Sequence, residues 1–260
     1  MPAPALLNAF AAYTHASGTT LGDLSGLQLW LDATVGVTDA GSGAVSNWAD
    51  QSGNGYDVAQ STSGYRPTTG TMSQNSLNVI SFDGSDDHLT SAAALSTWRF
   101  LHETTSTYFV VVNALDRGSG YGGVWFQTRP LGVLAEYGAF LGSYDPRNNL
   151  SIKNGNGTTW SMHTADSLAA GWHIVCVRHD APNQTATWSV DGGAFASMTI
   201  SNQNAPSSGQ DPANAFTIAK SPFDGYFYGG FAEIGITNTL VDDSTAATQI
   251  AALNSKWAVY

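Results

Sequence analysis

The sequence has almost no cysteine and no long apolar run. A single cysteine, Cys176, among 260 residues excludes an internal disulfide framework and any cysteine-based metal cluster. No apolar segment reaches the roughly 20 residues that a membrane-spanning helix needs, so we expect no membrane insertion. The first segment, MPAPALLNAFAAYTHAS, lacks the basic start and the long apolar centre of a secretory signal, so we expect no export by that route.

Basic residues are scarce as well. There are 9 Lys and Arg against 20 Asp and Glu, which gives a formal net charge of −11. This charge disfavours partners that present phosphate groups, so we expect neither nucleic acid nor an anionic membrane surface as a partner. Charged residues make up only 11% of the chain, which leaves Ser, Thr, Asn, Gln and Gly to build the surface. Such surfaces are common in extracellular, carbohydrate-facing and virion β proteins.

Seven segments have the length and composition of β-strands. They are rich in β-branched and aromatic residues and lie at 27–33, 77–84, 107–114, 172–180, 185–193, 215–220 and 231–237. Polar, Gly-rich stretches separate them, and we expect loops at 36–46, 61–76, 116–123, 142–158 and 201–214. Many strands, with helices only at the ends of the chain, predict an all-β fold: an antiparallel two-sheet sandwich in one domain.

Both ends of the chain have helical patterns. Near the C-terminus, capping residues precede apolar residues at helical spacing, which predicts a helix that packs on the sandwich through Ile250, Leu253 and Trp257. Near the N-terminus, a short amphipathic helix is predicted from the spacing of Leu6, Leu7, Phe10 and Tyr13. Its apolar stripe either packs on its own domain or serves as an attachment arm. We therefore divide the chain into a helix and linker at 1–26 and a sandwich domain at 27–260.

Short segments in a fixed order resemble a known superfamily. They are LWLDA (29–33), WADQSGNGYDVAQ (48–60), RP (66–67), FDGSDDHL (82–89), GWHIVCVRHD (171–180), SVDGG (189–193) and DGYFYGGFAEIGI (224–236). Together they resemble the laminin-G-like branch of the concanavalin A-like lectin/glucanase superfamily. The resemblance implies a jelly-roll sandwich, of a kind often found in phage tail, fibre and head-surface proteins and in secreted bacterial proteins. It does not fix a function.

Known hydrolase motifs are missing from the sequence. Glucanases of this superfamily carry acidic residues at alternate positions of one strand, whereas Glu136 and Glu233 have no acidic partner two positions away. Neither Gly-x-Ser-x-Gly nor His-Glu-x-x-His occurs. We therefore expect no catalytic residues and a protein that is not an enzyme. An active glycanase stays open only through carboxylates that meet in the folded chain.

Two acidic segments could bind calcium. Ca²⁺ is held by about six to eight oxygen atoms from carboxylates, carbonyls and amides. FDGSDDHL offers three aspartates within five positions, and WADQSGNGYD offers Asp50, Asn54 and Asp57. The candidate ligands for a structural calcium ion are Asp86, Asp87 and Asp50; no other cofactor is expected. The alternative is that both segments form tight turns in which Asp accepts hydrogen bonds from the backbone.

Aromatic residues in the region 117–160 could bind carbohydrate. Sugars stack on aromatic rings and bond to planar polar groups, and Gly-rich turns would expose such rings at loop tips. The candidate carbohydrate-binding residues are Tyr121, Trp125, Tyr137, Tyr144 and Trp160. The alternative is that the tryptophans face the core.

The sequence favours a non-enzymatic virion-surface structural protein, such as a head-decoration, fibre or tail-associated protein. It would display a lectin-like sandwich that binds host or environmental glycans, attach through Leu6, Leu7, Phe10 and Tyr13, and contact other virion proteins or copies of itself as a homo-oligomer. The alternative is a secreted bacterial carbohydrate-binding module or an accessory domain of a glycoside hydrolase, with an extracellular location.

Overall fold

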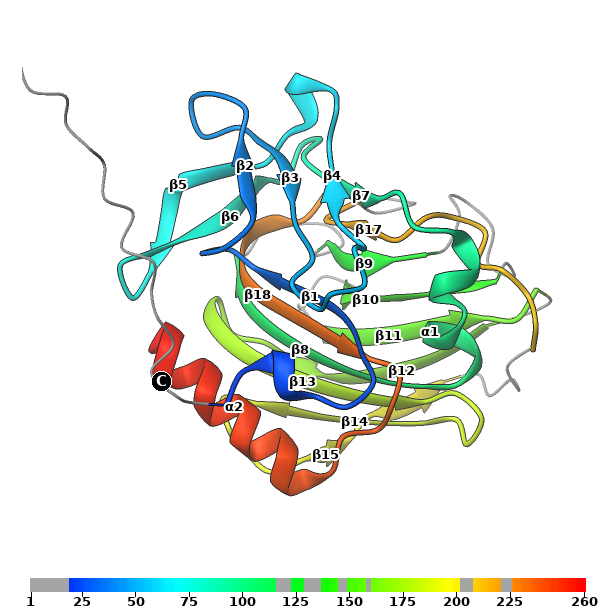
Figure 1. Cartoon of the computed structure of the whole chain (residues 1–260). Helices are drawn as coiled ribbons and strands as arrows, with labels where there is room; N and C mark the ends of the chain where they lie inside the picture. Colours follow the sequence, from blue (N-terminus) through cyan, green and yellow to red (C-terminus); the bar gives the residue numbers. More distant parts are fainter. Residues whose placement is uncertain are drawn as a thin grey trace, which may run out of the picture.

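The chain folds into two stacked antiparallel sheets, as predicted (Figure 1). The computed structural model describes residues 19–115, 123–128, 137–144, 149–157, 160–201, 208–220 and 226–260. Within these residues, one sheet has eight strands (sheet A) and the other has ten (sheet B). Among the described helices, none combines the length and the apolarity needed to cross a membrane.

Sheet A contains the strands that the sequence predicted most clearly. Its members are β1 (Leu27–Asp32), β5 (Thr68–Gln74), β6 (Leu77–Asp83), β8 (Thr105–Ala114), β13 (Gly171–Asp180), β14 (Thr185–Val190), β15 (Ala196–Ser197) and β18 (Tyr228–Thr237). They are ordered β15-β14-β13-β8-β18-β6-β5, with β1 also paired to β18.

Sheet B is built largely from short strands. Its members are β2 (Val37–Asp39), β3 (Val45–Trp48), β4 (Val58–Ala59), β7 (Leu89–Ser91), β9 (Val124–Gln127), β10 (Gly138–Tyr144), β11 (Asn149–Gly155), β12 (Trp160–Ser167), β16 (Thr199–Ser201) and β17 (Thr217–Ile218). They are ordered β16-β12-β11-β10-β9-β17-β7-β4-β3-β2.

Short helices complete the described fold. Three are 3₁₀ turns, η1 (Leu21–Asp23), η2 (Ser63–Tyr65) and η3 (Leu95–Trp98), and two are α-helical, α1 (Phe100–Glu103) and α2 (Asp243–Trp257). The predicted closing helix is confirmed as α2, and Asp242 caps it by accepting a hydrogen bond from Thr245 N at 2.9 Å. The predicted helix near residues 4–16 lies outside the described residues.

The continuously apolar sequence of β8 follows from its position in the fold. One side of a strand faces sheet B, and the other side of β8 is covered by α2 (Figure 1). Both sides are therefore dry, and Phe109, Val110, Val111 and Val112 are all fully buried. Between the sheets lies an aromatic core in which Phe227 stacks on Phe231 with ring centroids 4.6 Å apart.

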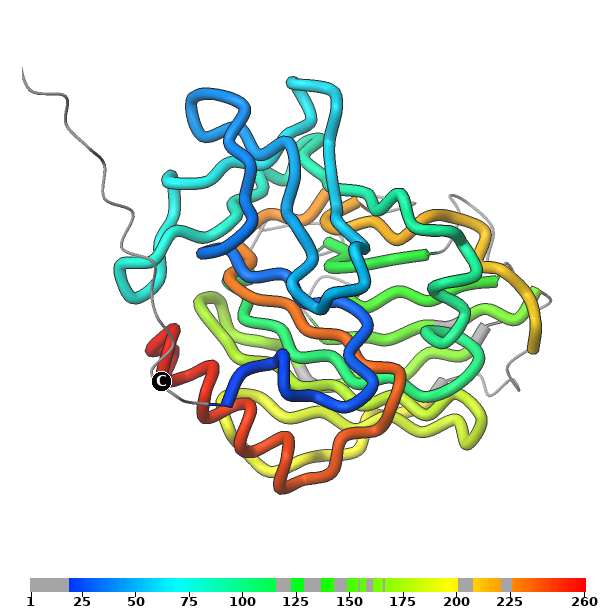
Figure 2. Tube along the Cα trace, viewed as in Figure 1, coloured from blue at the N-terminus to red at the C-terminus, as the bar shows by residue number. Residues whose placement is uncertain are grey.

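The two ends of the described chain lie side by side (Figure 2). β1 pairs with β18, so the blue first strand of the tube runs beside the orange strand that precedes the red C-terminal helix. Leu21 and Leu24, which the sequence analysis places in a linker, are buried in the core, and Leu21 packs over Gly235. The folded unit therefore begins before residue 27.

The Gly- and Ser-rich segments are less loop-like than the sequence predicted. Segment 61–76 contains β5, segment 36–46 contains β2, and segment 142–158 contains β11. Cross-strand pairing determines these strands, because neighbouring strands supply backbone hydrogen bonds to residues with low strand propensity. The predicted turn at Pro182 and Asn183 is confirmed, since it joins β13 to β14.

Two histidines meet between the sheets. His163 on β12 and His179 on β13 have ring centroids 5.5 Å apart, and neither is more than 1% exposed. None of their four ring nitrogens has a hydrogen-bond partner among the described residues. Burial lowers the pKa of His163, and burial together with the charge of His163 lowers the pKa of His179 to about 3, against a smaller opposing effect of Asp180. Both rings are neutral at neutral pH.

We predict that acid destabilises the sandwich through these histidines. Their folded-state pKa values lie below the unfolded value of about 6.5, so the unfolded chain binds protons first as the pH falls. This stability is present above about pH 6.5 and is lost as the pH falls below it; for His179, whose folded pKa is about 3, the loss is about 1.4 kcal/mol of unfolding free energy per pH unit between these values. In His179→Leu, urea unfolding between pH 6 and pH 4 should show a slope smaller by about that amount.

His173 provides the control. Its Nδ1 donates to Asp191 Oδ2 over 2.8 Å, and this hydrogen bond raises the pKa of His173. His173→Gln should therefore not reduce the acid loss of stability, because a raised pKa adds stability at low pH. If the pH dependence of the unfolding free energy is the same in His179→Leu as in the unaltered chain, His179 does not cause the acid loss of stability.

Candidate functional site

An aromatic cluster lies at the end of sheet B where β4, β7 and β17 meet. Tyr65, His88 and Tyr226, which we call the rim cluster, have His88 in the middle: its ring centroid is 5.7 Å from Tyr65 and 5.9 Å from Tyr226. Tyr65 is 44% exposed. Sheet alternation puts His88 and Thr90 on the same side of the chain, opposite the fully buried Leu89. The cluster therefore belongs to the outer face of sheet B.

Backbone hydrogen bonds hold the exposed Tyr65 in place. His88 N donates to Tyr65 O at 3.1 Å. The guanidinium of Arg66 donates from Nε to Gln60 O at 2.9 Å and from Nη2 to Ser61 O at 2.8 Å. These contacts close the loop that carries Tyr65. An aromatic ring on a fixed loop loses little conformational entropy when a ligand stacks on it.

The hydrogen bonds of His88 define its tautomer. Nδ1 lies 2.8 Å from Asp86 O, which can only accept, so Nδ1 carries the proton. Nε2 then accepts from Gln60 Nε2 at 3.0 Å. Burial, followed by the charge of Lys220, lowers the pKa of His88, while its contacts with Asp86 raise it. His88 is therefore a neutral ring that orders its two tyrosine neighbours.

Three aspartates lie next to the rim cluster. One ligand oxygen from each of Asp83, Asp86 and Asp87 falls within 4.8 Å of the others. Burial raises the pKa of Asp87 to about 6, and the negative charges of Asp83 and Asp86 add to that effect. Hard oxygen donors in this arrangement suit Ca²⁺. A calcium site with Asp86 and Asp87 as ligands stays a prediction.

Asp50 does not fit the calcium prediction. Its Oδ1 accepts from Trp30 N and Ser52 N, each at 2.9 Å, and its Oδ2 accepts from Ser52 Oγ at 2.7 Å and Tyr56 N at 3.0 Å. Four donors occupy the carboxylate, so the turn alternative describes Asp50. The loop of WADQSGNGYD is closed by Asp50 rather than by a metal ion.

The predicted carbohydrate-binding residues do not form one platform among the described residues. The prediction for Trp125 is wrong: its ring is fully buried and packs edge-on against Phe231 at 6.4 Å, because β9 lies inside sheet B. Tyr137 is partly buried and packs over Gly157. Tyr121 lies outside the described residues, as do the side chains of Tyr144 in β10 and Trp160 in β12.

The predicted attachment residues also lie outside the described part of the chain. These residues are Leu6, Leu7, Phe10 and Tyr13. The attachment arm therefore stays a prediction.

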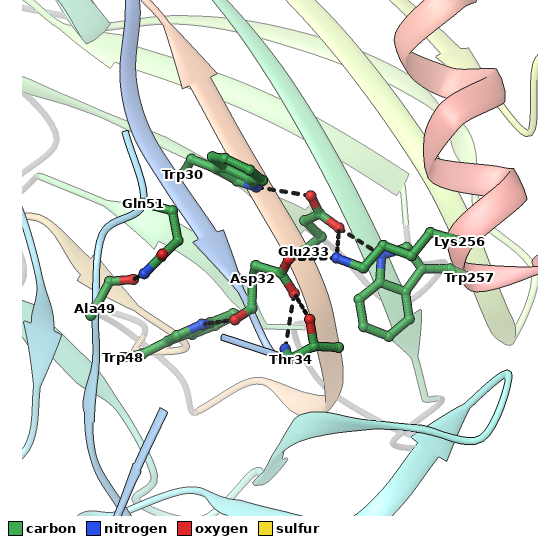
Figure 3. Close-up of polar contacts among 9 residues, drawn as sticks. All are labelled: Trp30, Asp32, Thr34, Trp48, Ala49, Gln51, Glu233, Lys256 and Trp257. Atoms are coloured by element: carbon green, nitrogen blue, oxygen red, sulfur yellow. Dashed lines mark hydrogen bonds and ion pairs between the residues drawn. The ribbon is translucent and has the colours of Figure 1, made fainter. Parts of the chain in front are cut away.

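Two carboxylates that are far apart in the sequence meet in the fold. Asp32 on β1 pairs in register with Glu233 on β18. Lys256 of α2 lies between them, with Nζ 2.5 Å from Asp32 Oδ2 and 2.8 Å from Glu233 Oε2 (Figure 3). Carboxylates that meet only in the folded chain were the one route to an active glycanase that the sequence left open, and this pair shows no local pattern because Asp32 comes from a neighbouring strand.

The contacts around Glu233 form a structural tie, by which we mean the buried, hydrogen-bonded ion pairs that join β1, β18 and α2. Trp30 Nε1 donates to Oε1 and Trp257 Nε1 donates to Oε2, both at 2.8 Å (Figure 3). Burial and Asp32 raise the pKa of Glu233, but three N–H donors hold its carboxylate in the ionised form. Asp32 is 1% exposed and Glu233 is 3% exposed. Neither carboxylate is open to a substrate.

The sequence matches no protein-family model and no curated protein. Solved structures show the fold. The chain is similar to a Trypanosoma rangeli sialidase in complex with 2,3-difluorosialic acid (TM-score 0.57, 14% identity, 92% of this chain and 34% of that one). It is similar to an arabinofuranosidase complexed with arabinofuranosyl-alpha-1,2-xylobiose (TM-score 0.56, 13% identity, 82% and 51%). It is also similar to the binding domain of botulinum neurotoxin DC in complex with SialylT (TM-score 0.53, 12% identity, 90% and 52%).

The fold is therefore the concanavalin A-like lectin sandwich that the sequence resemblance implied. The chain spans about half or less of the length of these three proteins. At such low identity the likeness shows the fold alone. None of the three names describes a virion protein, so the link to phage gains no support from them.

We predict that Lys256→Met destabilises the fold by about 3–5 kcal/mol, because it leaves two buried carboxylates without a counter-ion. Chemical denaturation would measure the loss. Adding Glu233→Gln to Lys256→Met should restore part of the stability, because it removes one of the unpaired charges. A loss below about 1 kcal/mol in the single variant would show that the tie is dispensable.

We predict that calcium raises the melting temperature and that Asp86→Asn removes this response. The reason is that a divalent cation relieves the repulsion among three neighbouring carboxylates. Calorimetry in calcium and in EDTA would test it, with Asp50→Asn as the control that melts lower in both solutions. Identical melting of the unaltered chain in the two solutions would exclude a structural calcium ion.

Proposed function

We propose that the chain is a lectin-like, non-enzymatic carbohydrate-binding module whose ligand stacks on the rim cluster. The observation that carries the proposal is the exposed and fixed ring of Tyr65. It is 44% exposed, it lies beside His88, and the loop behind it is held by Arg66. A large exposed aromatic on a fixed loop is a binding feature more than a packing feature.

The surroundings of the rim cluster supply polar groups as well as rings. No described residue donates a hydrogen bond to the Asp86 carboxylate. The hydroxyls of Thr90 and Thr217 lie 3.3 Å apart on the same face of sheet B. Sugar rings present an apolar face to an aromatic ring and hydroxyls to such polar groups. The rim cluster therefore matches the two sides of a carbohydrate.

The similar structures support this class of ligand. The arabinofuranosidase and the sialidase are named as complexes with a sugar and a sugar analogue, and the toxin fragment is named as a binding domain. Of the two roles considered from the sequence, they favour the secreted carbohydrate-binding module over the virion-surface protein. An extracellular location goes with that role. Display on a particle and assembly into a homo-oligomer stay predictions.

The burial of one carboxylate pair supports binding without hydrolysis. Hydrolysis of a glycosidic bond needs two carboxyl groups that face the substrate. Asp32 and Glu233 are buried and paired with Lys256. We infer that the module holds a glycan and leaves it intact.

We predict that Tyr65→Ala weakens glycan binding about tenfold or more, because a lost stacking contact worth about 1.4 kcal/mol changes the dissociation constant tenfold. Array screening followed by calorimetric titration would measure it, and the glycan should be recovered uncleaved. Tyr260→Ala is the matched control, since Tyr260 is also exposed, at 57%, but lies at the C-terminus. Equal binding by the unaltered chain and Tyr65→Ala would contradict the site, and cleavage of the glycan would contradict the non-enzymatic role.

A further inference from the structure

Within the part of the chain that the structure describes, Lys220 is a cation without a counter-ion beside the rim cluster. It follows β17 and forms an isolated antiparallel bridge with Tyr226, so the backbone places it next to one of the three rings. Its side chain is half-buried, and no hydrogen bond or ion pair joins its ammonium to a described residue. By contrast, Arg99 and Arg178 each hold an aspartate, and Lys256 holds two carboxylates. A half-buried, unpaired cation is unfavourable by itself and favours an anionic partner.

The backbone before Lys220 is in a conformation that side chains seldom adopt. Ala219 is fully buried and has a φ of 68°, in the left-handed region. Its carbonyl accepts from Phe227 N at 2.9 Å, and its N–H donates to Trp125 O at 3.0 Å. These bonds fix the bend that sets Lys220 opposite Tyr226. Such backbone strain is concentrated at functional positions.

Lys220 also dominates the charges that act on the middle ring. Of the charged side chains near His88, Lys220 has the largest effect on its pKa, ahead of Asp86, and the two effects have opposite sign. The ring is neutral and donates its one proton to Asp86 O, so it does not add to the positive charge. The positive charge of Lys220 therefore reaches the centre of the rim cluster, although the chain as a whole carries −11.

We propose that Lys220 makes the rim cluster selective for acidic sugars, whose carboxylate would pair with its ammonium while the sugar ring stacks on Tyr65 or Tyr226. This inference rests on the proposed function. It goes further by specifying that the ligand is anionic and that Lys220 recognises its negative charge. Lys220 is a specificity residue here, and the tyrosines provide the stacking surface.

The test compares matched acidic and neutral sugars. After an array of acidic and neutral glycans, calorimetry would compare sialyllactose with lactose, and oligogalacturonate with its carboxyl-reduced form. The acidic member of the better pair should bind about tenfold more tightly at low salt, and added salt should reduce the difference. Lys220→Met should abolish the preference and leave the affinity for the neutral member unchanged, whereas Lys220→Arg should keep most of it.

Two controls separate charge recognition from damage to the fold. Arg99→Met removes a cation that is paired with Asp211 and should leave the preference intact. Thermal melting should confirm that Lys220→Met is folded; if it is not, Lys220→Gln and Lys220→Arg give the same comparison. If these variants lose affinity for the acidic and the neutral sugar equally, Lys220 supports the structure only, and the inference is overturned.

The outcomes also distinguish the inference from the function on which it rests. If the array gives only neutral glycans and their binding is lost in Tyr65→Ala, the inference about acidic sugars is wrong and the proposed function stands. If the array gives no ligand of either class, both fail. If acidic peptides bind where acidic glycans do not, the cation recognises a different class of molecule and the inference is wrong.

Discussion

The ammonium of Lys256, buried between the carboxylates of Asp32 and Glu233, ties the fold together. It joins the first strand of sheet A, the last strand of that sheet and the C-terminal helix, at distances of 2.5 and 2.8 Å. Two carboxylates against one ammonium leave an excess negative charge, which the indole N–H groups of Trp30 and Trp257 help to offset. α2 is held on the outer side of sheet A, over β8 and β13, whereas the rim cluster lies on the outer face of sheet B.

The rim cluster is built on the same two sheets, but its side chains differ from those of the core in exposure and pairing. In the core, large rings are buried, as with Trp48, whose Nε1 donates to Asp32 O at 2.9 Å. The end of sheet B that carries the rim cluster differs. Tyr65 is exposed although Arg66 and His88 hold its loop by hydrogen bonds, Lys220 has no counter-ion among the described residues, and the alanine before it has a φ of 68°. Departures from good packing that cluster at one place on a stable fold are typical of binding sites.

The sequence predicts the fold well where propensity and burial agree. Segments such as GWHIVCVRHD are apolar on both sides of the strand, so they are visible without tertiary information, and they became β13. β11, with the sequence NLSIKNG, has little strand propensity and forms because β10 and β12 pair with it on both sides. Trp125 looked like a loop residue for the same reason, since the strand that buries it is short and lies between Gly-rich stretches.

The site was harder to predict than the fold. Tyr65, His88 and Tyr226 are separated by 23 and 138 positions, and no local pattern brings them together. Asp32 and Glu233 illustrate the same limit, because a search at spacing two along one strand cannot find a partner on the next. By contrast, local chemistry predicted correctly what a turn needs, and Asp50 closes its loop with four hydrogen bonds.

A glycan bound by the sandwich should stack on the rim cluster. The most direct measurement is an NMR titration of the labelled chain with a glycan that it binds, following the ring signals of Tyr65, His88 and Tyr226 together with those of Tyr260. The account predicts that the rim signals shift in a saturable way at one common dissociation constant while Tyr260 stays unchanged. Saturable shifts confined to residues elsewhere on the sandwich, with the rim signals unmoved, would contradict it.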